Sequence, residues 1–134
     1  MKIKWPGFIF KRFLALSVIV AAMTLMQASQ VLAHASLVKA EPARRAVLST
    51  PPARIHLWFN EEIEPAYAAL SVLNEDKKSI TDNKVEVDSK DPKSVVLELP
   101  DMQPGRYTVK FRVLSVDGHV VDSEYNFTVA SEKK

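Results

Sequence analysis

Hydrophobic and polar residues alternate along most of the chain after residue 53, with the two-residue period of a half-buried β-strand. The clearest case has Ile55, Leu57 and Phe59 alternating with His56 and Trp58. Comparable segments, rich in Val, Leu, Tyr or Phe, follow at residues 67–73, 94–99, 107–113 and 120–129. With a strand at 36–39 and a weak one at 85–87, the pattern predicts about seven strands. No segment after Ala33 has a convincing helical pattern.

Turn-forming residues separate these segments and are expected to interrupt the strands. They are the pairs Pro51-Pro52, Asp91-Pro92, Pro100-Asp101 and Pro104-Gly105. Short strands at such intervals are typical of β-sandwiches. We therefore expect an all-β fold, an antiparallel Greek-key β-sandwich or barrel.

The first 33 residues have the layout of a secretory signal peptide. A basic start is followed by an uncharged run at 13–26 and a more polar end that closes in Val31-Leu32-Ala33. The run is shorter than the roughly 20 residues that a helix needs to cross a bilayer, so we expect no membrane anchor after cleavage. Cleavage after Ala33 leaves one mature domain, residues 34–134, in the periplasm. A cut after Ala28 is the main alternative, and an uncut anchor is the weaker one.

Removal of the leader changes the charge of the chain. Lys plus Arg falls from 18 to 14 while all 16 acidic residues remain, so the formal net charge goes from +2 to −2. A nearly neutral domain without a basic stripe gives no electrostatic argument for nucleic acid. The chain has no cysteine, which excludes disulfides and thiolate ligands, so a metal would need nitrogen and oxygen ligands. A Cu(I) site is disfavoured because Met102 is the single methionine left after cleavage.

His34 is the strongest candidate metal ligand among the three histidines. After cleavage at Ala33 it would present a free α-amine and an imidazole Nδ1, which can close a six-membered chelate ring on one ion. A divalent ion can displace the amine proton near neutral pH. Cu(II) is the favoured ion, because among divalent ions it binds such ligands most tightly and it favours tetragonal nitrogen and oxygen sites. Zinc is the weaker alternative.

Asp117-Gly118-His119 supplies possible partners for His34. In an extended segment residues two apart face the same side, so the Asp117 carboxylate and the His119 imidazole are expected to converge on one ion. Gly118 permits a tight backbone there. Asp-Gly is also a common turn dipeptide, so the motif is weak without His34. Together these residues offer one amine, two imidazoles and one carboxylate, which suits one Cu(II) ion per chain.

Two further polar residues lie on or just after the strand at 55–59. His56 lies on the side opposite Ile55 and Leu57, so it is expected to face solvent and to be no ligand. Glu61 directly follows the strand and could reach the site as a weak ligand or as an acceptor beside it.

Several segments of the mature chain resemble the CopC/PcoC family of periplasmic copper-resistance proteins. They are His34-Ala35-Ser36-Leu37, Glu41-Pro42-Ala43, residues 52–61, residues 105–113, Leu114-Ser115-Val116-Asp117-Gly118-His119 and Phe127-Thr128-Val129. The resemblance implies a cupredoxin-like or immunoglobulin-like Greek-key barrel. It also implies that Cu(II) is held by the terminal amine and imidazole of His34, by Asp117 and by His119, with Glu61 as an auxiliary ligand.

The chain departs from the family pattern at three points. Arg44-Arg45 stands where the family often has a glycine, Asp122 stands where a glycine is frequent, and a methionine-rich loop is absent. Family members with two sites carry Cu(I) on that loop, so this sequence is similar to the type that binds Cu(II) alone.

The resulting functional hypothesis is a monomeric copper-binding protein, not an enzyme, that acts in copper homeostasis. It would sequester Cu(II) or deliver it to a CopD-type inner-membrane copper transporter, the partner that the resemblance implies. Two alternatives stay open. One is an oxidative enzyme built on the same chelate, as in lytic polysaccharide monooxygenases, although the small domain shows no aromatic platform for a polysaccharide. The other is a metal-free β-sandwich that binds proteins.

Overall fold

The computed structural model describes Lys2 and residues 34–131. The expected signal peptide and its cleavage site lie outside the described residues. His34–Lys134 form one compact unit. Within the described part of the chain, no helix is long and apolar enough to cross a membrane.

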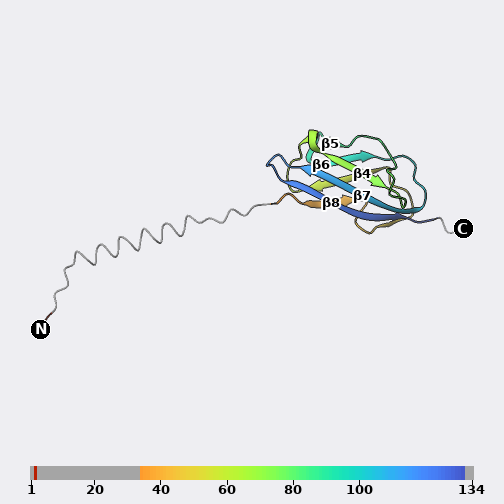
Figure 1. Ribbon diagram of the computed structural model, residues 1–134, viewed down its shortest axis with the longest axis horizontal. Coiled ribbons are helices and arrows are strands. Elements are labelled where there is room, and N and C mark those ends of the chain that lie inside the picture. The colour runs from red at the N-terminus through yellow and green to blue at the C-terminus, as the bar shows by residue number, and fades with distance from the viewer. Residues whose placement is uncertain (1, 3–33, 132–134) are drawn as a thin grey trace. The chain divides into compact units, whose positions relative to one another are not determined.

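Two four-stranded sheets pack face to face, as the sequence predicted (Figure 1). One sheet has the order β1 (Leu37–Glu41), β3 (Arg54–Phe59), β6 (Asp91–Glu98) and β5 (Glu86–Asp88). The other has the order β2 (Val47–Leu48), β8 (Val120–Val129), β7 (Gly105–Leu114) and β4 (Ala69–Leu73). A 3-10 turn, η1 (Pro65–Tyr67), precedes β4.

The all-β sandwich is confirmed, and three local expectations are corrected. An eighth strand, β2, was missed, and it pairs parallel with β8, so the second sheet is not wholly antiparallel. Pro92 does not interrupt the chain but lies inside β6, where its carbonyl accepts a hydrogen bond from the Ile63 amide at 2.9 Å. Tyr67, the first residue of the strand predicted at 67–73, belongs to η1 instead, and β4 begins at Ala69.

The core lies between the sheets and consists of alternate residues of the long strands. In β3 the side chains of Ile55, Leu57 and Phe59 are at most 3% exposed. The same alternation buries Val109 and Phe111 in β7. Since successive side chains of a strand point to opposite faces, the polar residues between them lie on the outer faces. The two-residue period of hydrophobic residues in the sequence thus corresponds to the alternation of buried and outward-facing side chains in these strands.

The loops at one end of the sandwich are joined to one another. Ile63 and Ser115 form an isolated antiparallel bridge. The amide of Val116 donates to the carbonyl of Glu62, and the amide of Glu64 donates to the carbonyl of Leu114, both at 2.9 Å. These bonds hold the loop after β3 against the turn between β7 and β8. The described domain begins at this same end (Figure 1).

Candidate metal centre

The side chain of Asn60, the residue after β3, holds the segment where the described domain begins. Its Oδ1 accepts a hydrogen bond from the Ser36 amide at 2.6 Å, and its Nδ2 donates to the His34 carbonyl at 3.2 Å. The Asn60 amide also donates to the Ser36 carbonyl at 3.1 Å. One residue therefore fixes the backbone on both sides of residue 35, immediately before β1.

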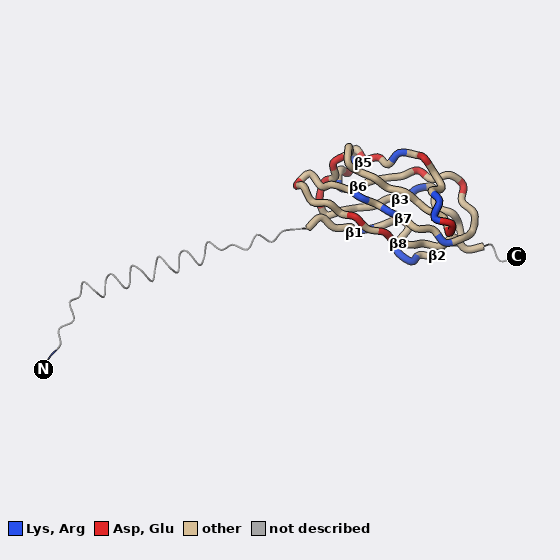
Figure 2. Tube along the Cα trace, in the orientation of Figure 1, with Lys and Arg blue, Asp and Glu red and all other residues tan. Residues whose placement is uncertain are grey.

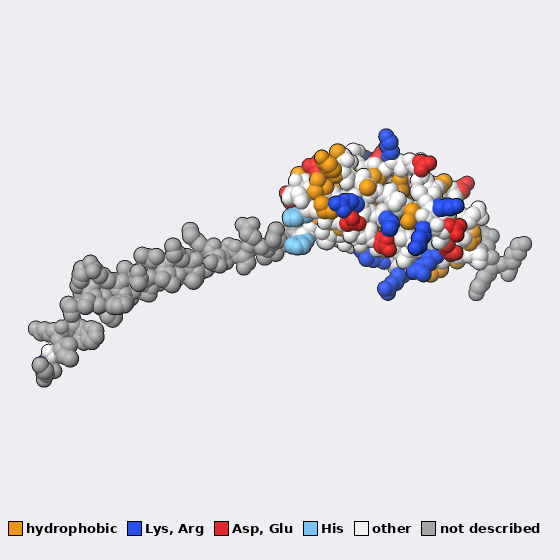
Figure 3. Space-filling view, viewed as in Figure 1, with side chains coloured by type: hydrophobic (Ala, Val, Ile, Leu, Met, Phe, Trp, Pro, Cys, Tyr) orange, Lys and Arg blue, Asp and Glu red, His pale blue; other side chains and the backbone are white. Residues whose placement is uncertain are grey.

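His34 and His119 lie together at this end of the sandwich. Their rings are stacked with centroids 6.2 Å apart and an angle of 15° between the ring planes. Histidine side chains are visible side by side on the surface there (Figure 3). An imidazole nitrogen binds a divalent ion at about 2.0 Å, so two nitrogens on opposite sides of one ion lie about 4 Å apart, and their ring centres lie further apart. The ring separation is of the size that one shared ion requires.

Glu61, two residues after the end of β3, faces His119, the residue just before β8. Its Oε2 lies 3.6 Å from His119 Nδ1, and the two side chains are 13% and 32% exposed. Neither atom touches solvent, and neither has a hydrogen-bond partner among the described residues. Buried polar atoms without partners are uncommon in folded proteins. A slightly closer approach would let an Nδ1–H group donate to Oε2 and satisfy both atoms, so the pair fits a carboxylate that orients a metal-bound histidine.

Asp117 is placed differently from His119. The segment 115–119 is a tight turn, closed by bonds from the Gly118 amide to the Ser115 carbonyl and from the Ser115 amide to the His119 carbonyl. The expectation of an extended segment is therefore wrong, because Gly118 takes a φ of +90° that favours a turn. Asp117 is exposed in this turn. Its role as a ligand stays a prediction.

The ligand set is not preassembled in the described part of the chain. There, no group of three or more His, Asp or Glu side chains lies close enough together to hold a metal ion. The structure brings together His34, His119 and Glu61 in two pairwise contacts that share His119. The amine of His34 is joined to Ala33 in this chain, so the terminal chelate belongs to the cleaved form alone.

His56 has partners of its own on the outer face of the first sheet. It is half-buried rather than solvent-facing, because the ring of Trp58, two residues along the same face, stacks on it with a centroid distance of 3.6 Å. Ser94 Oγ donates to the Asp91 carbonyl at 3.1 Å and lies 3.0 Å from His56 Nε2, so Oγ accepts from that nitrogen. Burial, with Arg54 nearby, lowers the pKa of His56.

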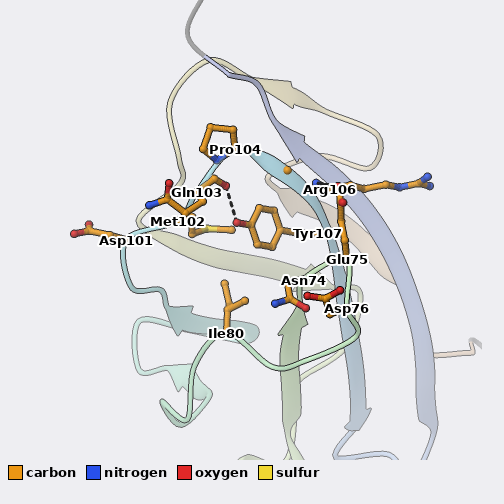
Figure 4. Close-up of a pocket in the computed structure, with 11 residues that line it drawn as sticks. Asn74, Glu75, Asp76, Ile80, Asp101, Met102, Gln103, Pro104, Arg106 and Tyr107 are labelled. Atoms are coloured by element: carbon orange, nitrogen blue, oxygen red, sulfur yellow. Dashed lines mark hydrogen bonds between the residues drawn. The ribbon is translucent and has the colours of Figure 1, made fainter.

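A cavity of about 350 Å³ lies at the other end of β7 (Figure 4). The buried side chains of Met102 and Tyr107 border it, together with Ile80, while Asp76 and Asp101 lie at its margin. The Tyr107 hydroxyl donates to the Gln103 carbonyl at 2.6 Å. Met102 is 7% exposed and belongs to the core. This arrangement explains Met102 as a packing residue.

Two residues that support the candidate centre were not identified from the sequence. Asn60 ends a strand and precedes Glu61, but a single amide does not indicate which backbone groups it will bind. Ser115 is fully buried, and its Oγ accepts a hydrogen bond from the His119 amide at 3.0 Å. A serine two residues before Asp-Gly is a turn signal that could have suggested this bond.

Comparisons with known proteins agree on one family. A model of the CopC domain matches residues 37–130, a range that includes Glu61, Asp117 and His119 but not His34. Protein YobA of Escherichia coli K12 is 32% identical over 107 residues, which are 79% of this chain and 86% of that protein. The copper transport protein CutJ of Bacillus subtilis is 26% identical over 98 residues, which are 72% of this chain but 18% of CutJ.

Solved structures resemble the described domain over nearly their whole length. CopC from Methylosinus trichosporium OB3b is 35% identical, with a TM-score of 0.70, and the match covers 75% of this chain and 98% of that one. PcoC, a methionine-rich copper resistance protein from Escherichia coli, is 26% identical, with a TM-score of 0.63 and coverage of 72% and 99%.

Proposed function

Since this chain belongs to the CopC domain family, we propose that its mature form is a periplasmic copper carrier that binds one Cu(II) ion at the His34 end of the sandwich. The ligands are the terminal amine and imidazole of His34, the imidazole of His119 and the carboxylate of Asp117. The protein does no chemistry on the ion and acts in copper homeostasis. Similar proteins named for copper resistance and copper transport support the choice of metal.

The observation that carries the proposal is that His119 contacts two possible metal-site partners. Its ring stacks against that of His34, and its Nδ1 faces Glu61 Oε2. Two imidazoles and an amine are nitrogen donors, and such donors bind Cu(II) more tightly than they bind other divalent ions. The exposed turn leaves Asp117 able to swing toward the ion when it binds.

Glu61 acts mainly on His119 in this proposal. Metal-bound histidines commonly donate their second ring N–H to a carboxylate, which fixes the ring orientation and raises the basicity of the ligating nitrogen. Because Glu61 Oε2 faces Nδ1, the nitrogen left for copper is Nε2. A shortening from 3.6 Å to hydrogen-bond distance is expected when the ion binds.

Delivery to a membrane copper transporter is the second half of the proposal. The part of CutJ that matches this chain is 18% of that copper transport protein, so a domain of this kind can be part of a larger transport chain. We infer that this chain, as a separate protein, exchanges copper with a CopD-type transporter that carries the remaining machinery. A monomer suits such a carrier, because one copy holds the whole site.

A Cu(II) titration followed by electron paramagnetic resonance tests the site. Two proteins that both begin at His34 are compared, one with a free α-amine and one with that amine acetylated. We expect one equivalent of Cu(II) with nitrogen couplings in the first and at least about tenfold weaker binding in the second, because acetylation removes the amine from the chelate ring. Both proteins keep the same fold and the same internal ligands.

The result also separates the alternative functions. If the two proteins bind copper equally, the amine is no ligand and a metal-free protein-binding module becomes the better explanation. An oxidative enzyme would share the tight site, so it is tested separately by reducing the loaded protein in the presence of oxygen and polysaccharide. Cleaved polysaccharide in that assay would contradict the carrier.

A further inference from the structure

Large hydrophobic side chains are exposed beside the candidate metal centre. Five such side chains are exposed among the described residues, namely Val38, Val47, Tyr67, Val116 and Val120. Of these, Val116 and Val120 flank the turn that carries His119, and Tyr67 lies in η1, which contacts β7. Figure 3 shows hydrophobic side chains gathered at the end of the molecule that carries the histidines. Isolated exposed hydrophobics are ordinary, but a group beside a functional site marks an interaction surface.

The backbone pairing brings these residues together at one end of β7 and β8. Val120 is directly opposite Leu114 in the β7–β8 ladder, so their side chains are neighbours on the outer face. The amide of Glu64 bonds to the Leu114 carbonyl, and the amide of Tyr67 bonds to the Glu64 carbonyl at 3.1 Å, which places η1 beside Leu114. We call the surface formed by Tyr67, Leu114, Val116 and Val120 the apolar end patch.

The border of the apolar end patch toward the metal centre is acidic. Glu62 and Asp117 are exposed and Glu64 is half-buried, and among the described residues none of them forms an ion pair. Acidic positions at this end of the trace are visible in Figure 2. On the opposite border, Arg112 is neutralised by Asp122 at 2.7 Å. The free charge around the patch is therefore negative.

We propose that the apolar end patch is the docking surface for the protein that exchanges copper with this chain, and that this partner presents an apolar face bordered by Lys or Arg. The inference rests on the proposed function, because the patch adjoins the ion that the partner must reach. Acidic borders would repel each other in a dimer of this chain and would repel anionic lipid headgroups. Charge complementarity therefore favours a protein with a basic border over either of these occupants.

Copper transfer to membrane vesicles tests the patch. The mature protein is loaded with Cu(II), and the rate of copper uptake is measured against its concentration with right-side-out vesicles from the source cells. Liposomes of the lipids extracted from these vesicles serve as the membrane without protein. The test variant combines Tyr67→Ser with Val120→Thr, and the control is Val47→Thr, because Val47 is 71% exposed and lies at the opposite end of β8. Each protein is first shown by electron paramagnetic resonance to bind one equivalent of Cu(II).

The expected result is saturable uptake by the vesicles, with a half-saturating concentration about tenfold higher for the test variant and unchanged for the control. Equal uptake from all three proteins would overturn the docking surface while leaving the copper site intact. Uptake that is not saturable, or that is the same with liposomes, would overturn the protein partner. A concentration-dependent dimer that the test variant abolishes would assign the patch to self-association. If the wild type binds no Cu(II), the proposed function fails before the patch is tested.

Discussion

Asn60 donates a hydrogen bond from its side-chain Nδ2 to the carbonyl oxygen of His34 at 3.2 Å. With the bond from the Ser36 amide to Asn60 Oδ1, this contact ties the start of the mature domain to the end of β3. Glu61 is the next residue and faces His119. The end of β3 therefore lies beside both histidines of the candidate centre, with Asn60 bonded to the His34 backbone and Glu61 facing the His119 ring.

The substitution Asn60→Ala is predicted to weaken Cu(II) binding by about tenfold, because it removes two side-chain hydrogen bonds, one to His34 and one to Ser36, worth roughly 1 kcal/mol each. The backbone bond from the Asn60 amide to Ser36 remains, so the fold should persist. The measurement is a competitive Cu(II) titration at constant pH, with the chelate signal read by electron paramagnetic resonance.

Two comparisons make this prediction specific to positioning. Asn74→Ala is the matched control, because Asn74 Oδ1 also accepts a backbone bond, from the Lys78 amide, in a loop bordering the cavity at the other end of β7. In the acetylated protein, which lacks the terminal chelate, Asn60→Ala should cause no further loss. An equal loss with and without the acetyl group would show that Asn60 acts through general stability.

Strand burial could be predicted from the sequence, whereas the closing of the loops could not. Val120–Val129 has the predicted bounds, because alternation over ten residues reports its two faces unambiguously. β2 has only two residues, too few to show a period, and bonds from Thr128 to Ala46 and from Ala130 to Leu48 hold it against β8. Such partners are distant in sequence, so no local pattern identifies them.

The candidate centre shows the same division. The chemistry of the histidines and carboxylates could be stated from residue types alone. Their placement depends on the contact between residues 62–64 and 114–116, which forms only in the folded chain. The extended backbone assumed for residues 117–119 was wrong, because the turn preference of Gly118 outweighs strand geometry there, and the convergence of Asp117 and His119 on one ion stays a prediction.

The substitution Glu61→Gln should separate copper affinity from the stability of the copper-free protein. The neutral amide binds His119 Nδ1 less strongly in the loaded state, so Cu(II) affinity is expected to fall by about tenfold. Without copper, the amide N–H can donate to an unprotonated Nδ1, so the free energy of unfolding should rise by about 1 kcal/mol. Urea unfolding in chelator measures the second effect, and copper competition measures the first.

Glu62→Gln is the control for this pair of effects. Glu62 is adjacent and exposed, and the change removes the same charge without touching His119. It should change neither copper affinity nor stability beyond a few tenths of a kcal/mol. A Glu61→Gln protein that loses affinity and stability together would argue against the role assigned to Glu61.

The lowered pKa of His56 predicts how the free energy of unfolding depends on pH. Its pKa in the folded protein is lowered below the ordinary 6.5 by burial and by Arg54, so the unfolded chain binds the proton more readily. The contribution of neutral His56 is therefore fully present above about pH 6.5 and is lost as the pH falls below that value. In urea unfolding of the copper-free protein from about pH 7.5 to about pH 5, His56→Gln should flatten this decline. A decline of equal size in both proteins would contradict the assignment.

Gly118→Ala should destabilise the turn that carries Asp117 and His119. The φ of +90° at Gly118 is rarely adopted by residues with a side chain, while a Cβ built there meets nothing within 4 Å. The cost is therefore in the backbone alone, about 1–2 kcal/mol of unfolding free energy. Because Asn tolerates a positive φ better than Ala does, Gly118→Asn should lose less. If both variants are as stable as the wild type, the turn is not held in this conformation. That result would again favour the extended segment at Asp117 and His119 that the sequence predicted.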